Sequence, residues 1–375
     1  MNNTGKVIVA GHACLDITPI FSSTTKSKIS ELFVPGTLIH MDSAEVNVGG
    51  SVSNTGLAMK FLGADVKLIT KVGNDNFGET IASIYKAHGI KEGLVVDENS
   101  TTSYSVVLAP KGIDRIFLHH PGANDTFSNE DVLEEELEGV SLFHFGYPPL
   151  MKTMYENNGQ ELVSLFKRVK EKGLATSLDM AAVDENSESG KQDWKNILQN
   201  LLPYVDFFVP SVEELCFMLD PERLLEWKKR AKDKEITEVL DYKNNVEPLG
   251  NELLKMGCKV VLIKCGAPGL YYTVADENNL NTMGNGILKN TKNWASKNGF
   301  EKSYMPDLIV SATGAGDTTI AAFLTSILKG YSLEEALQLA TATGALNVTS
   351  YDALSGLKSF DEIKEKINNG WKKSW

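Results

Sequence analysis

The sequence predicts an α/β fold with one central, mostly parallel sheet, helices on both of its faces, and a small separate β-sheet. The first observation is a regular alternation of apolar strand-type runs and helical runs from residue 129 onward. Strands that alternate with helices of about 10 to 15 residues are typical of a doubly wound parallel sheet. The second is β-type sequence outside this rhythm, which we expect to form a lid from residues 17–47 and 100–121 of a single domain spanning 1–375.

The expected strands are short runs rich in Val, Ile, Leu and Phe, which suit a buried pleated surface. They lie at 6–11, 37–41, 66–70, 140–145, 174–178, 206–209, 260–264 and 307–310. A turn at 110–112 joins two alternating runs, 103–108 and 115–119, and this spacing predicts a β-hairpin.

The expected helices are apolar-periodic runs, several of which end at a glycine such as Gly63, Gly173 or Gly330. They lie at 57–62, 130–138, 160–172, 194–202, 248–256, 315–329, 333–350 and 360–370. Two segments interrupt the pattern: 221–246, interpreted as solvated helix and loop because its charges are of mixed sign, and 278–302, interpreted as a polar insertion because turn residues occur throughout it.

Composition limits the possible partners. Of 375 residues, 37 are Lys or Arg and 49 are Asp or Glu, which gives a net charge of −12. That balance disfavours nucleic acid and anionic membrane surfaces as partners. A protein this acidic that binds a polyphosphate must gather positive potential locally.

The four cysteines have no C-x-x-C spacing and apolar neighbours, so we expect reduced structural thiols. The N-terminal residues lack a signal-peptide core, and no apolar run has the length of a membrane span. A cytoplasmic protein is therefore expected.

The most informative stretch is Ser311-Ala-Thr-Gly-Ala-Gly-Asp317, which precedes a run of small and apolar residues. Gly314, Ala315 and Gly316 would let backbone N–H groups at a helix start approach an anion closely. Asp317 beside them could accept the proton of an attacking hydroxyl. The simpler interpretation is a tight turn with an acidic residue that complements the helix dipole.

A second glycine-rich stretch precedes the helix at 57–62. Gly49 and Gly50 allow close approach of a ligand, and Asn54 offers a donor and an acceptor to a hydroxyl. Asp16 follows the first strand, where ligands of open α/β sheets bind. The alternatives are a capped helix start for 49–54 and a turn residue for Asp16.

These motifs together resemble the ribokinase-like carbohydrate kinases, the PfkB family. The resemblance runs from about residue 6 to about residue 359 and is carried by the Gly-Gly-x-x-x-Asn block at 49–54 and the Thr-Gly-Ala-Gly-Asp block at 313–317. It implies transfer of the γ-phosphate of ATP to a sugar hydroxyl, with Mg²⁺ as cofactor.

The resemblance also implies roles for particular residues. Asp317 would be the base, and the amides of Gly314, Ala315 and Gly316 would be the anion hole for the transferring phosphoryl group. The remaining assignments are Asp16, Gly49, Gly50 and Asn54 to the sugar, Lys264, Gly266, Gly269, Thr313 and Asn347 to the nucleotide, and Glu214 to the metal.

Two departures from the family pattern bear on the cofactors. Ser311-Ala312 stands where the family usually has Asp-Thr, which puts activation by a monovalent cation such as potassium in doubt. The Asn-x-x-Glu motif appears as Ser211-Val-Glu-Glu214, so only Glu214 carries over.

Three functions remain open from the sequence: a sugar kinase, a nucleoside kinase of the same fold, and a non-catalytic sugar-binding protein. We also expect a homodimer formed through the exposed small sheets. Which hydroxyl of which acceptor is phosphorylated is not encoded in any pattern identified.

Overall fold

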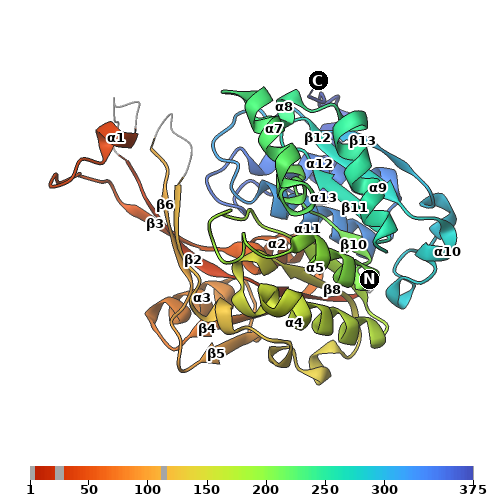
Figure 1. The fold of residues 1–375 in the computed structure, drawn as a ribbon, viewed down its shortest axis with the longest axis horizontal. Helices are drawn as coiled ribbons and strands as arrows, with labels where there is room; N and C mark the ends of the chain where they lie inside the picture. The colour runs from red at the N-terminus through yellow and green to blue at the C-terminus, as the bar shows by residue number, and fades with distance from the viewer. Residues whose placement is uncertain (1–4, 22–28, 111–115, 375) are drawn as a thin grey trace.

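The computed structural model describes residues 5–21, 29–110 and 116–374 (Figure 1). Within these ranges the strands form a nine-stranded sheet in the order β13-β12-β11-β10-β9-β8-β1-β4-β5. Its members are β1 Lys6–Gly11, β4 Asp65–Gly73, β5 Leu94–Asp97, β8 Val140–Gly146, β9 Ala175–Asp179, β10 Phe207–Phe208, β11 Val260–Lys264, β12 Gly269–Val274 and β13 Asn298–Lys302. In sheet order, the seven strands β11, β10, β9, β8, β1, β4 and β5 run parallel to one another, and β12 and β13 form an antiparallel edge beside β11. The predicted mostly parallel sheet is confirmed.

Helices cover both faces of this sheet because successive residues of each strand point to opposite sides. In β1, Ile8 and Ala10 pack in one core, whereas Val7 and Val9 pack in the other. The first core is completed by α4 Lys152–Glu171, α5 Trp194–Leu201, α6 Val212–Leu219, α7 Pro221–Ala231 and α9 Glu247–Lys255. The second is completed by α2 Gly50–Phe61, α3 Asn76–Ala87, α11 Ala315–Leu328 and α12 Leu333–Asn347, with α13 Phe360–Asn368 packed on α12.

A separate four-stranded sheet has the order β3-β2-β6-β7 and extends away from the main body (Figure 1). It consists of β2 Cys14–Pro19, β3 Ala44–Gly49, β6 Tyr104–Leu108 and β7 Ile116–His120. The predicted hairpin is confirmed by antiparallel pairing of β6 with β7. The expected turn at 110–112 falls partly outside the described residues, and the action of this sheet as a lid stays a prediction.

The expected strand at 37–41 is wrong. Residues 37–43 form no strand, and the chain pairs with β2 only from Ala44 onward. Leu38 is 82% exposed, so the apolar character of this run reflects no buried sheet face.

Two further expectations are wrong. Residues 307–310 form no strand: Leu308 and Ile309 are exposed, and the Val310 N–H donates to Val348 O just after α12. The acidic run 130–138 forms two short 3₁₀ turns in place of an α-helix, and its carboxylates bond backbone N–H groups locally.

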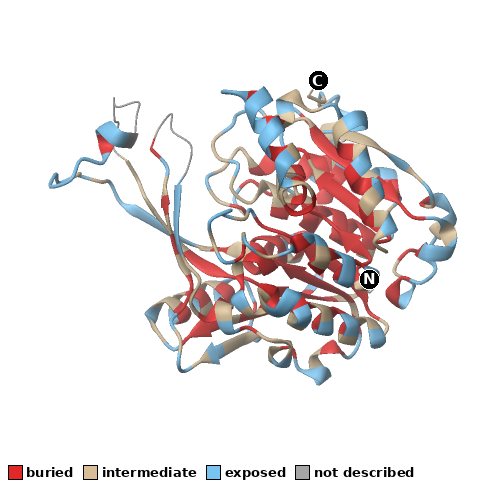
Figure 2. Cartoon of the chain, in the orientation of Figure 1, coloured by how far each residue is buried: buried red, intermediate tan, exposed pale blue. Residues whose placement is uncertain are grey.

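The short helices α1 Ile29–Leu32, α8 Ile236–Val239 and α10 Glu277–Leu280 lie in the connecting segments. The burial pattern shows the central strands enclosed and the far part of the small sheet exposed (Figure 2). All four cysteines are free and buried, as expected. Among the helices of the described ranges, none has the length and apolar character required to cross a membrane.

A buried ion pair fastens the 278–302 insertion to the sheet. Asp206 is fully buried and accepts both a 2.5 Å and a 2.6 Å bond from Lys170, together with the N–H groups of Thr176 and Gly284. Gly284 packs so closely on Leu174 that an added Cβ would lie 2.0 Å from its carbonyl. The insertion is thus part of the folded body.

We expect Lys170→Met to lower the free energy of unfolding by about 3–5 kcal/mol, because it leaves the Asp206 carboxylate buried without its cation. Urea denaturation measures the change. Lys172→Met is the matched control: its ion pair with Glu134 is exposed and should be worth less than about 1 kcal/mol. Equal losses in the two variants would contradict a structural role for the buried pair.

Candidate active site

Asp317 lies in the first turn of α11, at the side of the main sheet from which the small sheet departs. The turn before it requires glycine at position 314, whose φ is 73° and where a Cβ would lie 2.4 Å from that of Ala353. The N–H groups of Gly314 and Gly316 have no acceptor among the described residues, whereas that of Ala315 donates to Ala312 O at 3.3 Å. The helix start therefore presents free donors beside a carboxylate.

Three side chains hold the Asp317 carboxylate. Tyr147 donates to Oδ1 at 2.7 Å, Thr55 donates to Oδ1 at 3.4 Å, and Asn54 Nδ2 donates to Oδ2 at 3.0 Å. Burial raises the pKa of Asp317, while the Lys264 ammonium and these donors oppose the rise. Oδ2 accepts the hydrogen bond of Asn54 and keeps a lone pair, so this oxygen can accept a proton.

Tyr147 and Thr55 are site residues that sequence reasoning missed. Tyr147 directly follows β8 with φ 68°, in the left-handed region that a bulky residue rarely adopts. Its position after a parallel strand was the available signal, because ligands of open α/β sheets bind at that edge. Thr55 is adjacent to Asn54 and gave no separate signal.

A lysine lies beside the amides. Lys264 ends β11, and its Nζ lies 3.5 Å from the place that a Gly316 Cβ would occupy. It forms a 2.7 Å ion pair with Asp179 at the end of β9. Burial raises the pKa of Asp179 to about 8; the Lys264 ammonium opposes this shift, and the carboxylates of Glu214 and Asp317 add to it. Asp179 is a third residue that the sequence assignment lacked, although its place at a strand tip was evident.

The residues that the resemblance assigns to the sugar lie together. A Cβ at Gly49 would lie 2.0 Å from Asp16 Oδ2, and a Cβ at Gly50, where φ is 82°, would lie 2.6 Å from His12 Nδ1. Burial raises the pKa of Asp16 to about 6, while the donors of Cys14 and Ser105 oppose the rise. Asn54 connects this group to the base through its bond to Asp317.

The nucleotide-side residues are more dispersed. Gly266 has φ 61° and faces Thr237, and Gly269 has φ 138° with no room for a Cβ beside Glu301 O, so chain packing already requires both glycines. Thr313 accepts a 3.0 Å bond from the Ser311 hydroxyl. Asn347 is fully buried, and its Oδ1 has no partner among the described residues.

Two carboxylates offer oxygen ligands of the kind that Mg²⁺ takes. Asp179 Oδ2 is buried without a hydrogen-bond partner in the described part of the chain, and Glu214 lies close enough to influence the pKa of Asp179. Glu214 Oε2 accepts the Ser211 N–H at 2.8 Å, which fixes its side chain at the start of α6. No group of three or more His, Cys, Asp or Glu with metal-binding geometry occurs among the residues described.

The segment around Ser311 does not fit a monovalent cation site that depends on a carboxylate. The Ser311 hydroxyl is engaged with Thr313, from which it also accepts the N–H at 3.1 Å. Asp352, which lies near it in the fold, uses both carboxylate oxygens on the N–H groups of Leu354 and Ser355 and on the Ser355 hydroxyl.

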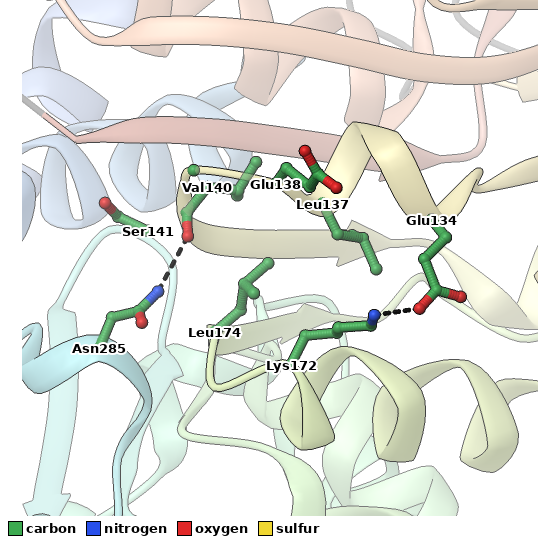
Figure 3. Close-up of a pocket in the computed structure, with 9 residues that line it drawn as sticks. Glu134, Leu137, Glu138, Val140, Ser141, Lys172, Leu174 and Asn285 are labelled. Atoms are coloured by element: carbon green, nitrogen blue, oxygen red, sulfur yellow. Dashed lines mark hydrogen bonds and ion pairs between the residues drawn. The ribbon is translucent and has the colours of Figure 1, made fainter.

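A pocket of about 440 Å³ lies beside the first residues of β8 and β9, at the end of these strands opposite to the end near Asp317 (Figure 3). Asn285 bonds Val140 O across it at 2.9 Å, and Lys172 pairs with Glu134 at its rim. It shares no residue with the site around Asp317.

Known proteins with similar folds support the architecture. The Arabidopsis thaliana ribokinase complexed with ribose and ATP has a TM-score of 0.68 at 19% identity, covering 96% of this chain and 98% of its own. The ribokinase of Thermotoga maritima also has a TM-score of 0.68 at 19% identity, with coverages of 97% and 100%. The fold is therefore ribokinase-like.

Sequence comparison gives the family. The pfkB family carbohydrate kinase description matches residues 7–359. Ribokinase of Staphylococcus aureus is 24% identical over 366 residues, 96% of this chain and 99% of its own length, and probable fructokinase-5 of Arabidopsis thaliana is 23% identical over 371 residues, 95% of each. The chain belongs to the pfkB family of carbohydrate kinases.

Proposed function

We propose that this sugar kinase transfers the γ-phosphoryl group of ATP to a sugar hydroxyl with Asp317 as the base. The observation that carries the proposal is the juxtaposition of a buried carboxylate, free amides at the start of α11 and the Lys264 ammonium beside Gly316. These are the groups that phosphoryl transfer to an alcohol requires: a proton acceptor and donors for the migrating charge.

In the proposed reaction the acceptor oxygen forms a bond to the γ-phosphorus while the bond from that phosphorus to the β,γ-bridging oxygen breaks. The hydroxyl proton passes to Asp317 Oδ2, and ADP leaves with the bridging oxygen. The amides of Gly314 and Gly316 hold the transferring oxygens, and Lys264, oriented by Asp179, neutralises the charge that builds up on them. Bound Mg²⁺ would neutralise further phosphate charge, with Asp179 and Glu214 as its nearest carboxylates.

The acceptor class needs separate evidence. Relatives with comparable similarity are named as a 6-phosphofructokinase from Thermoanaerobacterium thermosaccharolyticum and a 5-dehydro-2-deoxygluconokinase from Clostridium beijerinckii, at 23% and 22% identity. A nucleoside kinase of Methanocaldococcus jannaschii shares the fold with a TM-score of 0.64. A nucleoside kinase therefore stays the alternative to a sugar kinase in this proposal.

A homodimer through the small sheet is part of the same proposal. Val46 on β3 and Ile116, Phe117 and Leu118 on β7 are all exposed. Both of these strands are edges of the sheet, and exposed apolar edges are typical of surfaces that a second copy covers.

The pH dependence tests the base. Asp317 acts only when it is deprotonated, and its pKa is raised, so kcat should fall as the pH falls through a value above the ordinary Asp pKa of about 4. Measurement of kcat against pH at saturating sugar and ATP records this fall, which is the acidic limb of the pH profile. Because Asp16 also titrates, at about 6, the measurement is repeated with Asp16→Asn, which should keep the limb. A kcat that is constant down to about pH 4, or a limb abolished by Asp16→Asn, would contradict the assignment.

A further inference from the structure

His12 is a buried residue whose imidazole has no hydrogen-bond partner in the part of the chain that the structure describes. It follows β1, where its backbone N–H donates to Gly146 O at 3.1 Å and its carbonyl accepts the Val52 N–H at 3.0 Å. The side chain is 2% exposed, yet neither Nδ1 nor Nε2 has a partner among the described residues. Buried polar atoms are nearly always paired, so an imidazole with both nitrogens free indicates a missing ligand.

The surroundings place this ring in the acceptor subsite. The ring centroid of His12 lies 6.0 Å from that of Tyr147, the residue that donates to Asp317. The His119 ring of β7 lies 5.2 Å from the His12 ring and is tilted by 48°. His119 Nδ1 is 3.0 Å from the Ser105 hydroxyl, and Ser105 pairs in register with Asp16. His12 is thus a neighbour of Tyr147, which contacts Asp317, and of His119, which is linked through Ser105 to Asp16.

Gly50 lies against the His12 side chain, and a larger residue at this position would displace the ring. Its Cα approaches so closely that an added Cβ would lie 2.6 Å from His12 Nδ1 and 2.7 Å from His12 O. The glycine at the start of α2 therefore leaves room for the ring in this position, next to the helix that carries Asn54.

The chemistry of this subsite suits an uncharged hydroxyl. Burial, together with the neighbouring His119 ring, lowers the pKa of His12 to about 3, so the ring is neutral near pH 7. A neutral imidazole offers one N–H donor and one acceptor nitrogen, and a hydroxyl is likewise both donor and acceptor. An anionic group placed there would gain no ionic partner from His12 and would be repelled by the carboxylates of Asp16 and Asp317.

We propose that His12 hydrogen-bonds a hydroxyl of the acceptor and that, with the His119 ring beside it, it selects a free, uncharged sugar over a sugar phosphate or a sugar acid. This assignment rests on the proposed kinase function. His12 acts on binding of the acceptor and has no part in the proton transfer to Asp317.

Acceptor choice is the first test. The full-length protein is assayed for ADP release with ATP and Mg²⁺ and, separately, D-ribose, D-fructose, fructose 6-phosphate, gluconate and adenosine. A free sugar should give the highest kcat/KM. Preference for fructose 6-phosphate, gluconate or adenosine would overturn this inference while leaving a kinase, and no turnover with any acceptor would overturn the proposed function and the inference with it.

The second test uses His12→Phe, which keeps an aromatic ring and removes both hydrogen-bonding nitrogens, and His12→Gln, which keeps a donor and an acceptor. His12→Phe should raise KM for the sugar by about 10- to 100-fold with KM for ATP unchanged, because the sugar hydroxyl loses its partner. His12→Gln should recover at least part of this loss. His88→Phe, at an exposed histidine whose Nδ1 bonds its own helix, should change neither KM.

The thermal shift that the sugar produces on each variant provides a readout without turnover. If His12→Phe folds, as its unliganded melting temperature will show, and both its sugar KM and its sugar-induced shift equal those of the wild type, the inference is wrong. If it fails to fold, His12→Gln decides: a changed sugar KM with an unchanged ATP KM supports the role, and two unchanged values overturn it.

Discussion

Asp317→Asn is expected to lower kcat by about 10²–10⁴-fold while KM for sugar and ATP changes little. The substitution keeps the size of the side chain and can still meet Tyr147 and Asn54, but the amide has no basic oxygen to accept the hydroxyl proton. Asn54, Thr55 and Tyr147 all donate to Asp317, and among the described residues no other carboxylate accepts a hydrogen bond from these three donors. Steady-state kinetics with the preferred sugar measures both parameters.

Asp352→Asn is the matched control for this prediction. Asp352 lies close to the same turn, since Ala353 contacts the position of Gly314, but its carboxylate oxygens accept hydrogen bonds from the N–H groups of Leu354 and Ser355 and the Ser355 hydroxyl of its own loop. We expect its kcat to stay within an order of magnitude of the wild type. Turnover of Asp317→Asn equal to that of the wild type would show that another group takes the proton.

The second large effect is expected at Lys264. Lys264→Met should lower kcat by about 10²–10³-fold, since the transferring phosphoryl group loses a cation held beside the Gly316 amide. The protein has a net charge of −12, so a polyphosphate needs a local positive charge to bind. The Lys264 ammonium would supply that charge beside the Gly316 amide. Steady-state turnover at saturating ATP and Mg²⁺ measures the loss.

Stability must be separated from catalysis in that variant, because Lys264→Met leaves Asp179 buried without its cation, and loss of one partner of such a pair costs about 3–5 kcal/mol. The double variant Lys264→Met with Asp179→Asn removes both charges and should recover much of the stability without recovering activity. Lys297→Met, at an exposed pair with Glu334, controls for the loss of a positive charge and should leave kcat unchanged. A double variant with wild-type turnover would exclude Lys264 from the transfer.

Local sequence signals were sufficient for much of the fold. The alternation of helices and strands from residue 129, the β6–β7 hairpin and the glycine turn before α11 are all present, because each depends on periodicity or on a turn that only glycine tolerates. The wrong strand at 307–310 shows the limit of this reasoning. Its residues have strand propensity, but that propensity is realised only on a partly buried sheet surface; Leu308 and Ile309 are exposed and Val310 bonds Val348 O, which are tertiary properties.

The candidate site was predictable where motifs are contiguous. The 314–317 turn and the 49–54 block each present their functional atoms through local backbone geometry, so spacing alone indicates them. Tyr147 and His12 could not be recognised in the same way. Their proposed roles depend on contacts across long stretches of chain, Tyr147 to Asp317 and His12 to His119, and on burial that leaves the His12 imidazole without a hydrogen-bond partner among the described residues. Asp179 with Lys264 is the same case, an ion pair joining the ends of two strands.

The central claim is that this site moves a phosphoryl group from ATP to a sugar hydroxyl. Its most direct test is to incubate the protein with ATP, Mg²⁺ and a panel of free sugars, and to follow ADP formation together with the appearance of a sugar monophosphate by mass spectrometry. At least one sugar should yield ADP and sugar monophosphate in equal amounts, in a reaction that Asp317→Asn abolishes. Sugars that shift the melting temperature but never yield a phosphorylated product would contradict the claim and indicate a sugar-binding protein without kinase activity.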